Sequence, residues 1–144
     1  MLSIPLHNRF HHGAALVSIA NAFFLLFVSW EKYITKACSA CSFIPWLTVG
    51  DEFIGLLGAG MAFFIAGLAS LAGRNVFLGY LAFYLTLFSL VFGTLIQLGR
   101  FWSLGSFCTQ CLLSDALFSL TAMLLALWLW KKRQDKKENL HYAR

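Results

Sequence analysis

Charged residues are scarce in this chain. Only 12% of its 144 residues are Asp, Glu, Lys or Arg, whereas 60% are hydrophobic. Soluble domains carry about 25% charged residues, and a chain of this length cannot bury so much apolar surface in a core of its own. The composition therefore excludes a soluble globular protein and predicts that lipid covers most of the surface.

The sequence also lacks the period-two alternation of apolar and polar residues that marks a transmembrane β-strand. It has four long apolar runs instead, at residues 14–30, 53–72, 76–98 and 112–130. Each run is close to the roughly 20 residues with which a helix crosses about 30 Å of hydrocarbon. We predict an all-α integral membrane protein, a four-helix bundle in which residues 1–144 form a single transmembrane domain.

No small-x-small cleavage site follows the first apolar run, and the run is longer than the hydrophobic region of a usual signal peptide. We therefore expect it to stay in the protein as a helix. Small residues recur at four-residue spacing from Gly55 to Gly73, a pattern that lets a neighbouring helix approach closely. The five tryptophans lie near the predicted ends of spans, where indole prefers the boundary between lipid and water. They are Trp30, Trp46, Trp102, Trp128 and Trp130.

The basic residues predict how the bundle is oriented. Five crowd the end of the last run: Lys131, Lys132, Arg133, Lys136 and Lys137. Arg74 lies between the second and third runs, and Arg9 precedes the first. Cytoplasmic segments carry an excess of Lys and Arg, so both termini are expected in the cytoplasm and the helices alternate up, down, up and down. The net charge of +5 is thus explained by topology and does not predict a nucleic-acid partner.

Residues 31–52 and 99–107 are then expected as two loops on the exterior. They carry fewer cations, Lys32, Lys36 and Arg100. Four cysteines form two Cys-x-x-Cys pairs on this side, Cys38 with Cys41 in the first loop and Cys108 with Cys111 at the start of the fourth helix. At this spacing a disulfide closes and reopens with little backbone change, and a helix N-terminus stabilises a thiolate. We interpret both pairs as redox-active.

Two other uses of the four cysteines stay open. Four thiolates suit zinc or another soft metal, so a soft-metal-binding membrane protein is one alternative. Two structural disulfides are the other. Leu112 and Leu113 follow Cys111 directly, which places its sulfur at the edge of the hydrocarbon, where a lipid-soluble oxidant would meet it. This position favours a redox enzyme with no bound metal.

Segment 107–116, FCTQCLLSDA, resembles the fourth-helix signature of the vitamin K epoxide reductase (VKOR) family, in which an aromatic-flanked Cys-x-x-Cys-Leu opens the last helix of a four-helix bundle. Segment 51–58, DEFIGLLG, is similar to the glycine-containing start of that family's second helix. The resemblance covers roughly residues 10–130. DsbB-type disulfide-formation proteins are near neighbours, but their first motif sits at the mouth of the second helix, whereas here nine residues separate Cys41 from Asp51.

The resemblance implies a route for electrons. A thioredoxin-like (DsbA-like) partner would exchange with Cys38, Cys41 would bond transiently to Cys108, and Cys111 would face a quinone, either ubiquinone or menaquinone. The family's loop cysteines are commonly spaced more widely than Cys38 and Cys41 are. The expected location is the inner or cytoplasmic membrane, with multiple passes and the cysteine pairs facing the periplasm or exterior.

Several further side chains are candidates for the site. Asp115 lies four residues after Cys111, on the same helical face, where it either accepts a proton during the redox cycle or simply interacts with the helix dipole. Asn21 and Gln97 lie inside predicted spans, where a buried amide needs a partner; they are expected to join helices, with contact to a quinone carbonyl as the alternative. Three aromatic side chains are expected either to stack on the quinone or to anchor the chain at the membrane interface. They are Trp46, Trp102 and Phe107.

Overall fold

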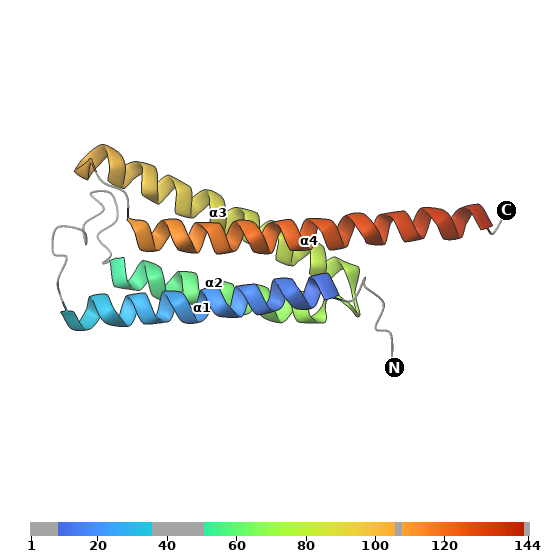
Figure 1. The fold of residues 1–144 in the computed structure, drawn as a ribbon, viewed down its shortest axis with the longest axis horizontal. Helices are drawn as coiled ribbons and strands as arrows, with labels where there is room; N and C mark the ends of the chain where they lie inside the picture. Colours follow the sequence, from blue (N-terminus) through green and yellow to red (C-terminus); the bar gives the residue numbers. More distant parts are fainter. Residues whose placement is uncertain (1–8, 36–50, 106–107, 143–144) are drawn as a thin grey trace.

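The computed structural model describes residues 9–35, 51–105 and 108–142. These residues form four helices: α1 (Arg9–Thr35), α2 (Asp51–Leu71), α3 (Val76–Leu104) and α4 (Thr109–Tyr142). Consecutive helices run in opposite directions (Figure 1). All four are long and apolar enough to cross a membrane. The prediction of an all-α bundle with four candidate spanning helices is thus confirmed.

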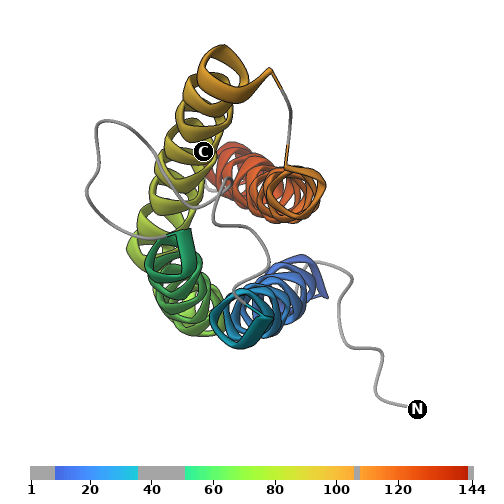
Figure 2. The ribbon, with the colours of Figure 1, turned by 90° about the vertical axis from the view of Figure 1, so that its left-hand side faces the viewer.

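The helices pack in a ring in which each has two main neighbours. Helix α1 lies against α2 and α4, and α3 lies against α4 and α2 (Figure 2). The closest pairing, α1 with α2, depends on the small residues of α2. Ala62 is fully buried, and its carbonyl accepts a hydrogen bond of 2.9 Å from Ser18 Oγ of α1. Gly55 and Gly58 likewise face α1 side chains. The predicted role of these small residues in packing is therefore confirmed.

Helix α3 continues beyond its predicted span. Asn75 caps its start, where Asn75 Oδ1 accepts a hydrogen bond of 3.0 Å from the Phe77 N–H. Gly105 ends it with φ of 68°, a left-handed conformation that glycine adopts without the steric cost of a Cβ. Residues 99–104 are therefore helical, and the prediction that Arg100 lies in a loop is wrong. The prediction ended the helix before Arg100 because this residue is charged. In the structure, however, the Arg100 side chain points inward and is only 4% exposed.

The described tryptophans divide into two groups. Trp30, Trp102 and Trp130 are exposed on the outside of the bundle, which agrees with an anchoring role at the membrane boundary. Trp128 is 1% exposed and packs over Gly79 of α3, so its predicted place in the boundary belt is wrong. The missing side chain of Gly79 leaves room for this indole between α3 and α4. Trp46 lies outside the described residues.

Candidate functional site

Cys108 and Cys111 lie where α4 begins. The Cys108 carbonyl accepts a hydrogen bond of 3.0 Å from the Leu112 N–H, the first bond of the helical pattern, so Cys108 occupies the N-cap position. Both cysteines are free thiols and are partly buried. The predicted position of this pair at a helix N-terminus is confirmed. Cys38 and Cys41, the other predicted pair, lie outside the described residues.

Cys108 is prepared to act as a thiolate. The Cys111 thiol donates a hydrogen bond to the Cys108 sulfur, and this contact is the main reason why the pKa of Cys108 falls from 9.0 to about 5. Burial opposes the change, while the Cys111 backbone N–H and the charges of Lys32 and Arg100 add to it. A sulfur that accepts a backbone N–H at a helix start is the thiol counterpart of an N-cap oxygen. Cys108 is therefore the thiol of the pair that ionises at the lower pH.

We expect this pKa to appear in the pH dependence of Cys108 alkylation in the reduced protein. Since a lowered pKa keeps the thiolate populated down to about pH 5, the iodoacetamide rate should stay flat between about pH 6 and pH 8 and fall below that range. In Cys111→Ala, which removes the donating thiol, the rate should rise with pH across the same range. Cys111→Ser keeps a donor and should restore most of the flat profile. Site-resolved mass spectrometry measures the rate, and identical profiles for the Ala and Ser variants would contradict the assigned cause.

Two polar residues of α3 reach this cysteine pair. Arg100 Nη1 lies 3.8 Å from Cys111 Sγ. Gln97 Nε2 donates a hydrogen bond of 3.3 Å to the Cys108 carbonyl. The two residues are three positions apart and therefore share one face of α3. A buried cation in a spanning helix costs free energy unless it stabilises a negative charge. The buried guanidinium of Arg100 lies beside the Cys111 sulfur.

A cavity of about 370 Å³ lies beside Cys111. All four helices contribute to its lining: Leu25, Val28, Ser29 and Lys32 of α1; Ile54, Gly55, Leu57, Gly58 and Met61 of α2; Phe88, Ser89, Phe92, Gly93 and Ile96 of α3; Gln110, Cys111, Ser114, Asp115 and Phe118 of α4. Most of these side chains are apolar. Three of them, Leu57, Phe88 and Phe92, are also exposed on the outside of the bundle. The cavity thus extends from Cys111 to the outer apolar surface of the bundle.

A few polar groups lie within this apolar lining. Asp115 shares the cavity with Cys111, as its position four residues further along the helix predicted. Gly93 of α3 leaves room for the Asp115 carboxylate, because a Cβ at that position would collide with it. Ser29 is 8% exposed, and its Oγ has no hydrogen-bond partner among the described residues. A buried hydroxyl without a partner is costly, so the cavity offers a ready donor to an acceptor atom of a ligand.

The other candidates from the sequence are placed differently. Trp102 is 86% exposed and does not line the cavity, which favours the role of an interface anchor, so its contact with a ligand stays a prediction. Trp46 and Phe107 lie outside the described residues. Asn21 Nδ2 donates to the Ser114 carbonyl at 3.5 Å and so joins α1 to α4, as expected of a polar packing residue. Gln97 joins α3 to the start of α4 in the same way.

Within the described ranges, no three His, Cys, Asp or Glu side chains gather in a group that would hold a metal ion. The soft-metal alternative requires Cys38 and Cys41 as well, and these lie outside those ranges, so that alternative stays a prediction. Comparisons with models of protein families, with curated proteins and with solved structures find no match for this chain.

Three residues of the site were not foreseen from the sequence: Ser29, Lys32 and Arg100. A signal for Arg100 was present in the spacing Gly93-x-x-x-Gln97-x-x-Arg100, which aligns one small and two polar residues on a single face of an otherwise apolar helix. Ser29 and Lys32 are likewise three residues apart at the end of α1. Their common helical face, and not their residue types, marks them as neighbours of one site.

Proposed function

We propose that this protein is a membrane thiol–disulfide oxidoreductase that passes electrons from a thioredoxin-like partner to a quinone, in the manner of the VKOR family. One observation carries the proposal: a largely apolar cavity, connected to the lipid-facing surface, contains both Cys111 and Asp115. Small lipid-soluble ligands favour such cavities, with few polar groups to orient them. Neither a structural disulfide nor a closed metal site requires an open apolar cavity beside the sulfur.

The arrangement of the helices supports a common side for both cysteine pairs. Cys108 precedes α4 at one end of the bundle, and Thr35 of α1 and Asp51 of α2 lie at the same end (Figure 1). The segment that contains Cys38 and Cys41 joins these two helix ends. The basic residues in the C-terminal part of α4, Lys131 to Lys137, lie at the opposite end, which we assign to the cytoplasm under the positive-inside rule. The cysteine pairs then face the periplasm or exterior.

The residues of the cavity fit a quinone. An apolar lining suits the ring, and the Ser29 hydroxyl supplies a donor for a carbonyl oxygen. A bound quinone supplies the capacity to accept two electrons and two protons. Oxidation of the Cys108 and Cys111 dithiol to a disulfide releases the same number of each, so the exchange is balanced. Ubiquinone and menaquinone both meet this chemical requirement.

Each residue of the site has a defined task in this proposal. Cys41 attacks the Cys108 sulfur of the Cys108–Cys111 disulfide, and Cys111 leaves as a thiolate beside the Arg100 guanidinium. Cys38 then attacks Cys41 and releases Cys108, which leaves the helix pair reduced. The lowered pKa of Cys108 suits this role, since a thiol of low pKa is a good leaving group. Asp115 accepts one of the two protons that the thiols release while the pair is reoxidised and passes it on within the cavity.

Trapping of the transient disulfide tests the proposal. In Cys38→Ser, the Cys41–Cys108 bond cannot be resolved by Cys38, so this linked pair should accumulate when the protein is mixed with a reduced thioredoxin-like partner. Non-reducing digestion and mass spectrometry identify the linked peptides, and Cys38→Ser with Cys41→Ser serves as the matched control. Detection of the Cys108–Cys111 bond alone, together with unchanged quinone absorbance in the wild-type protein, would overturn the proposal.

A further inference from the structure

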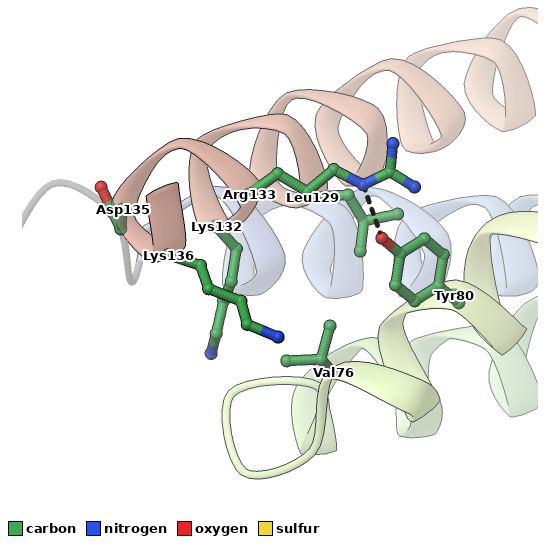
Figure 3. A pocket seen from close by; sticks show the side chains of 7 residues that line it. All are labelled: Val76, Tyr80, Leu129, Lys132, Arg133, Asp135 and Lys136. Carbon is green, nitrogen blue, oxygen red and sulfur yellow. Dashed lines mark hydrogen bonds between the residues drawn. The ribbon is translucent and has the colours of Figure 1, made fainter. Parts of the chain in front are cut away.

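A second cavity, of about 760 Å³, lies at the opposite end of the bundle from Cys108 and Cys111, between the start of α3 and the C-terminal part of α4. It has an apolar floor, formed by Val76 and Leu129. Tyr80 of α3 stands at one side. The close view shows the cationic side chains of α4 reaching across this space toward α3 (Figure 3). The cavity is therefore a groove with an apolar base and a charged rim.

The rim carries three cations and one carboxylate: Lys132, Arg133, Lys136 and Asp135. The Asp135 carboxylate points away from the two lysine ammonium groups (Figure 3). The first turn of α3 adds the positive end of a helix dipole at Val76. The electrostatic character of the groove is thus that of an anion site.

Tyr80 holds one of these cations in place. Arg133 Nε donates a hydrogen bond of 2.8 Å to the Tyr80 hydroxyl, and the guanidinium lies 5.5 Å from the centre of the Tyr80 ring (Figure 3). Lys132 Nζ lies 5.3 Å from the centre of the Trp128 ring. These contacts position the two charges before any ligand binds, which lowers the entropic cost of binding an anion.

The groove opens onto the part of the bundle that faces lipid. Phe77 follows Val76 and Trp130 follows Leu129, and both aromatic side chains are exposed. Exposed aromatic residues at the end of a spanning segment mark the level of the lipid headgroups. A ligand seated here has its anionic group among the cations and its apolar part along Phe77 and Trp130. This combination describes an amphiphile and not a soluble anion.

We propose that this groove binds the phosphate of an anionic phospholipid, such as phosphatidylglycerol, from the leaflet opposite the cysteine pairs. The site is independent of the redox function proposed above. Basic pockets between spanning helices are a common way to hold such headgroups. The bound lipid fixes the ends of α3 and α4 relative to one another, since its phosphate contacts cations of α4 next to the start of α3.

The test measures binding of phosphatidylglycerol to the full-length protein, purified in detergent and stripped of lipid, by native mass spectrometry. The groove variant combines Lys132→Gln, Arg133→Gln and Lys136→Gln. The control variant combines Arg74→Gln, Lys131→Gln and Lys137→Gln, which removes the same charge from the same end of the bundle but spares the groove. We expect affinity to fall about tenfold or more in the groove variant and less than about threefold in the control.

Two further arms complete the test. Phosphatidylcholine, which carries the same phosphate with a compensating cation, should bind the wild-type protein about tenfold more weakly. A phosphatidylglycerol with a photoreactive group should crosslink to peptides of α3 and α4 that line the groove, a readout that needs no variant. Equal losses in both triple variants, or crosslinks elsewhere only, would overturn the site. Equally strong competition by soluble glycerophosphoglycerol would show a site for free anions and refute the lipid assignment.

Discussion

Replacement of Cys111 by Ser is expected to abolish quinone reduction, with a loss of roughly 1000-fold or more, because enzymes accelerate such reactions by about 10⁶-fold and one sulfur cannot form the disulfide that supplies two electrons. Serine has nearly the same size as cysteine and keeps a hydrogen-bond donor for Cys108, so the fold should be unaffected. The measurement is the fall in quinone absorbance in detergent, with dithiothreitol as the electron donor.

The loop cysteines provide the matched control for this prediction. Dithiothreitol is small enough to reduce the helix pair directly, so Cys38→Ser with Cys41→Ser should keep its quinone reduction within about threefold of wild type. With a reduced thioredoxin-like protein as donor, the same double variant should be inactive. Retained activity of Cys111→Ser with either donor would show that the Cys111 sulfur takes no part in the reaction.

The second large effect is expected at Arg100. Arg100→Leu removes the cation 3.8 Å from Cys111 Sγ, and we expect the quinone-linked rate to fall about 100-fold, the order of loss found when one donor to a developing anion is removed. The same change should raise the pKa of Cys108, since the Arg100 charge helps to lower it. The alkylation profile of Cys108 should then shift to higher pH.

Arg100→Lys and Arg74→Leu separate the electrostatic role from a structural one. Lysine keeps the charge and should recover part of the rate, whereas Arg74 is exposed at the other end of the bundle and its loss should have little effect. Thermal unfolding of each variant reports whether the bundle is intact. If Arg100→Leu slowed quinone reduction but left the Cys108 profile unchanged, Arg100 would not act through the charge of the sulfur pair.

The fold was largely predictable because length and hydropathy decide it. Four apolar runs in a chain with few charges leave the helical bundle as the arrangement that satisfies every backbone hydrogen bond in lipid. The small residues of α2 also predicted close packing, since their four-residue spacing within one helix can be recognised from the sequence alone. The end of α3 was harder to predict, because a charged residue such as Arg100 at the end of an apolar run is typical of the start of a loop. Only the three-dimensional structure shows that its side chain turns inward, where it meets a sulfur from another helix.

The residues of the candidate site likewise differ in whether the sequence alone could predict them. Cys108, Cys111 and Asp115 could be grouped from the sequence because they lie on one helix with known spacing. Ser29 and Lys32 belong to α1, far away in the chain, and their approach to α4 depends on how the helices are arranged around the ring. Trp102 lies near the cysteines in sequence, but its position on α3 leaves its side chain 86% exposed and outside the cavity lining.

Leu57, Phe88 and Phe92 line the cavity beside Cys111 and are also exposed on the outside of the bundle, and this determines which concentration governs the occupancy of the cavity by a lipid-soluble ligand. A ligand that arrives by this path diffuses in the two dimensions of the membrane. Its effective concentration is the number of ligand molecules per lipid molecule, not per litre of buffer. Addition of more bilayer at a fixed total amount of ligand should therefore empty the cavity, although nothing in the aqueous phase has changed. In saturation experiments with this protein, the ligand concentration should therefore be expressed as the mole fraction of ligand in the membrane.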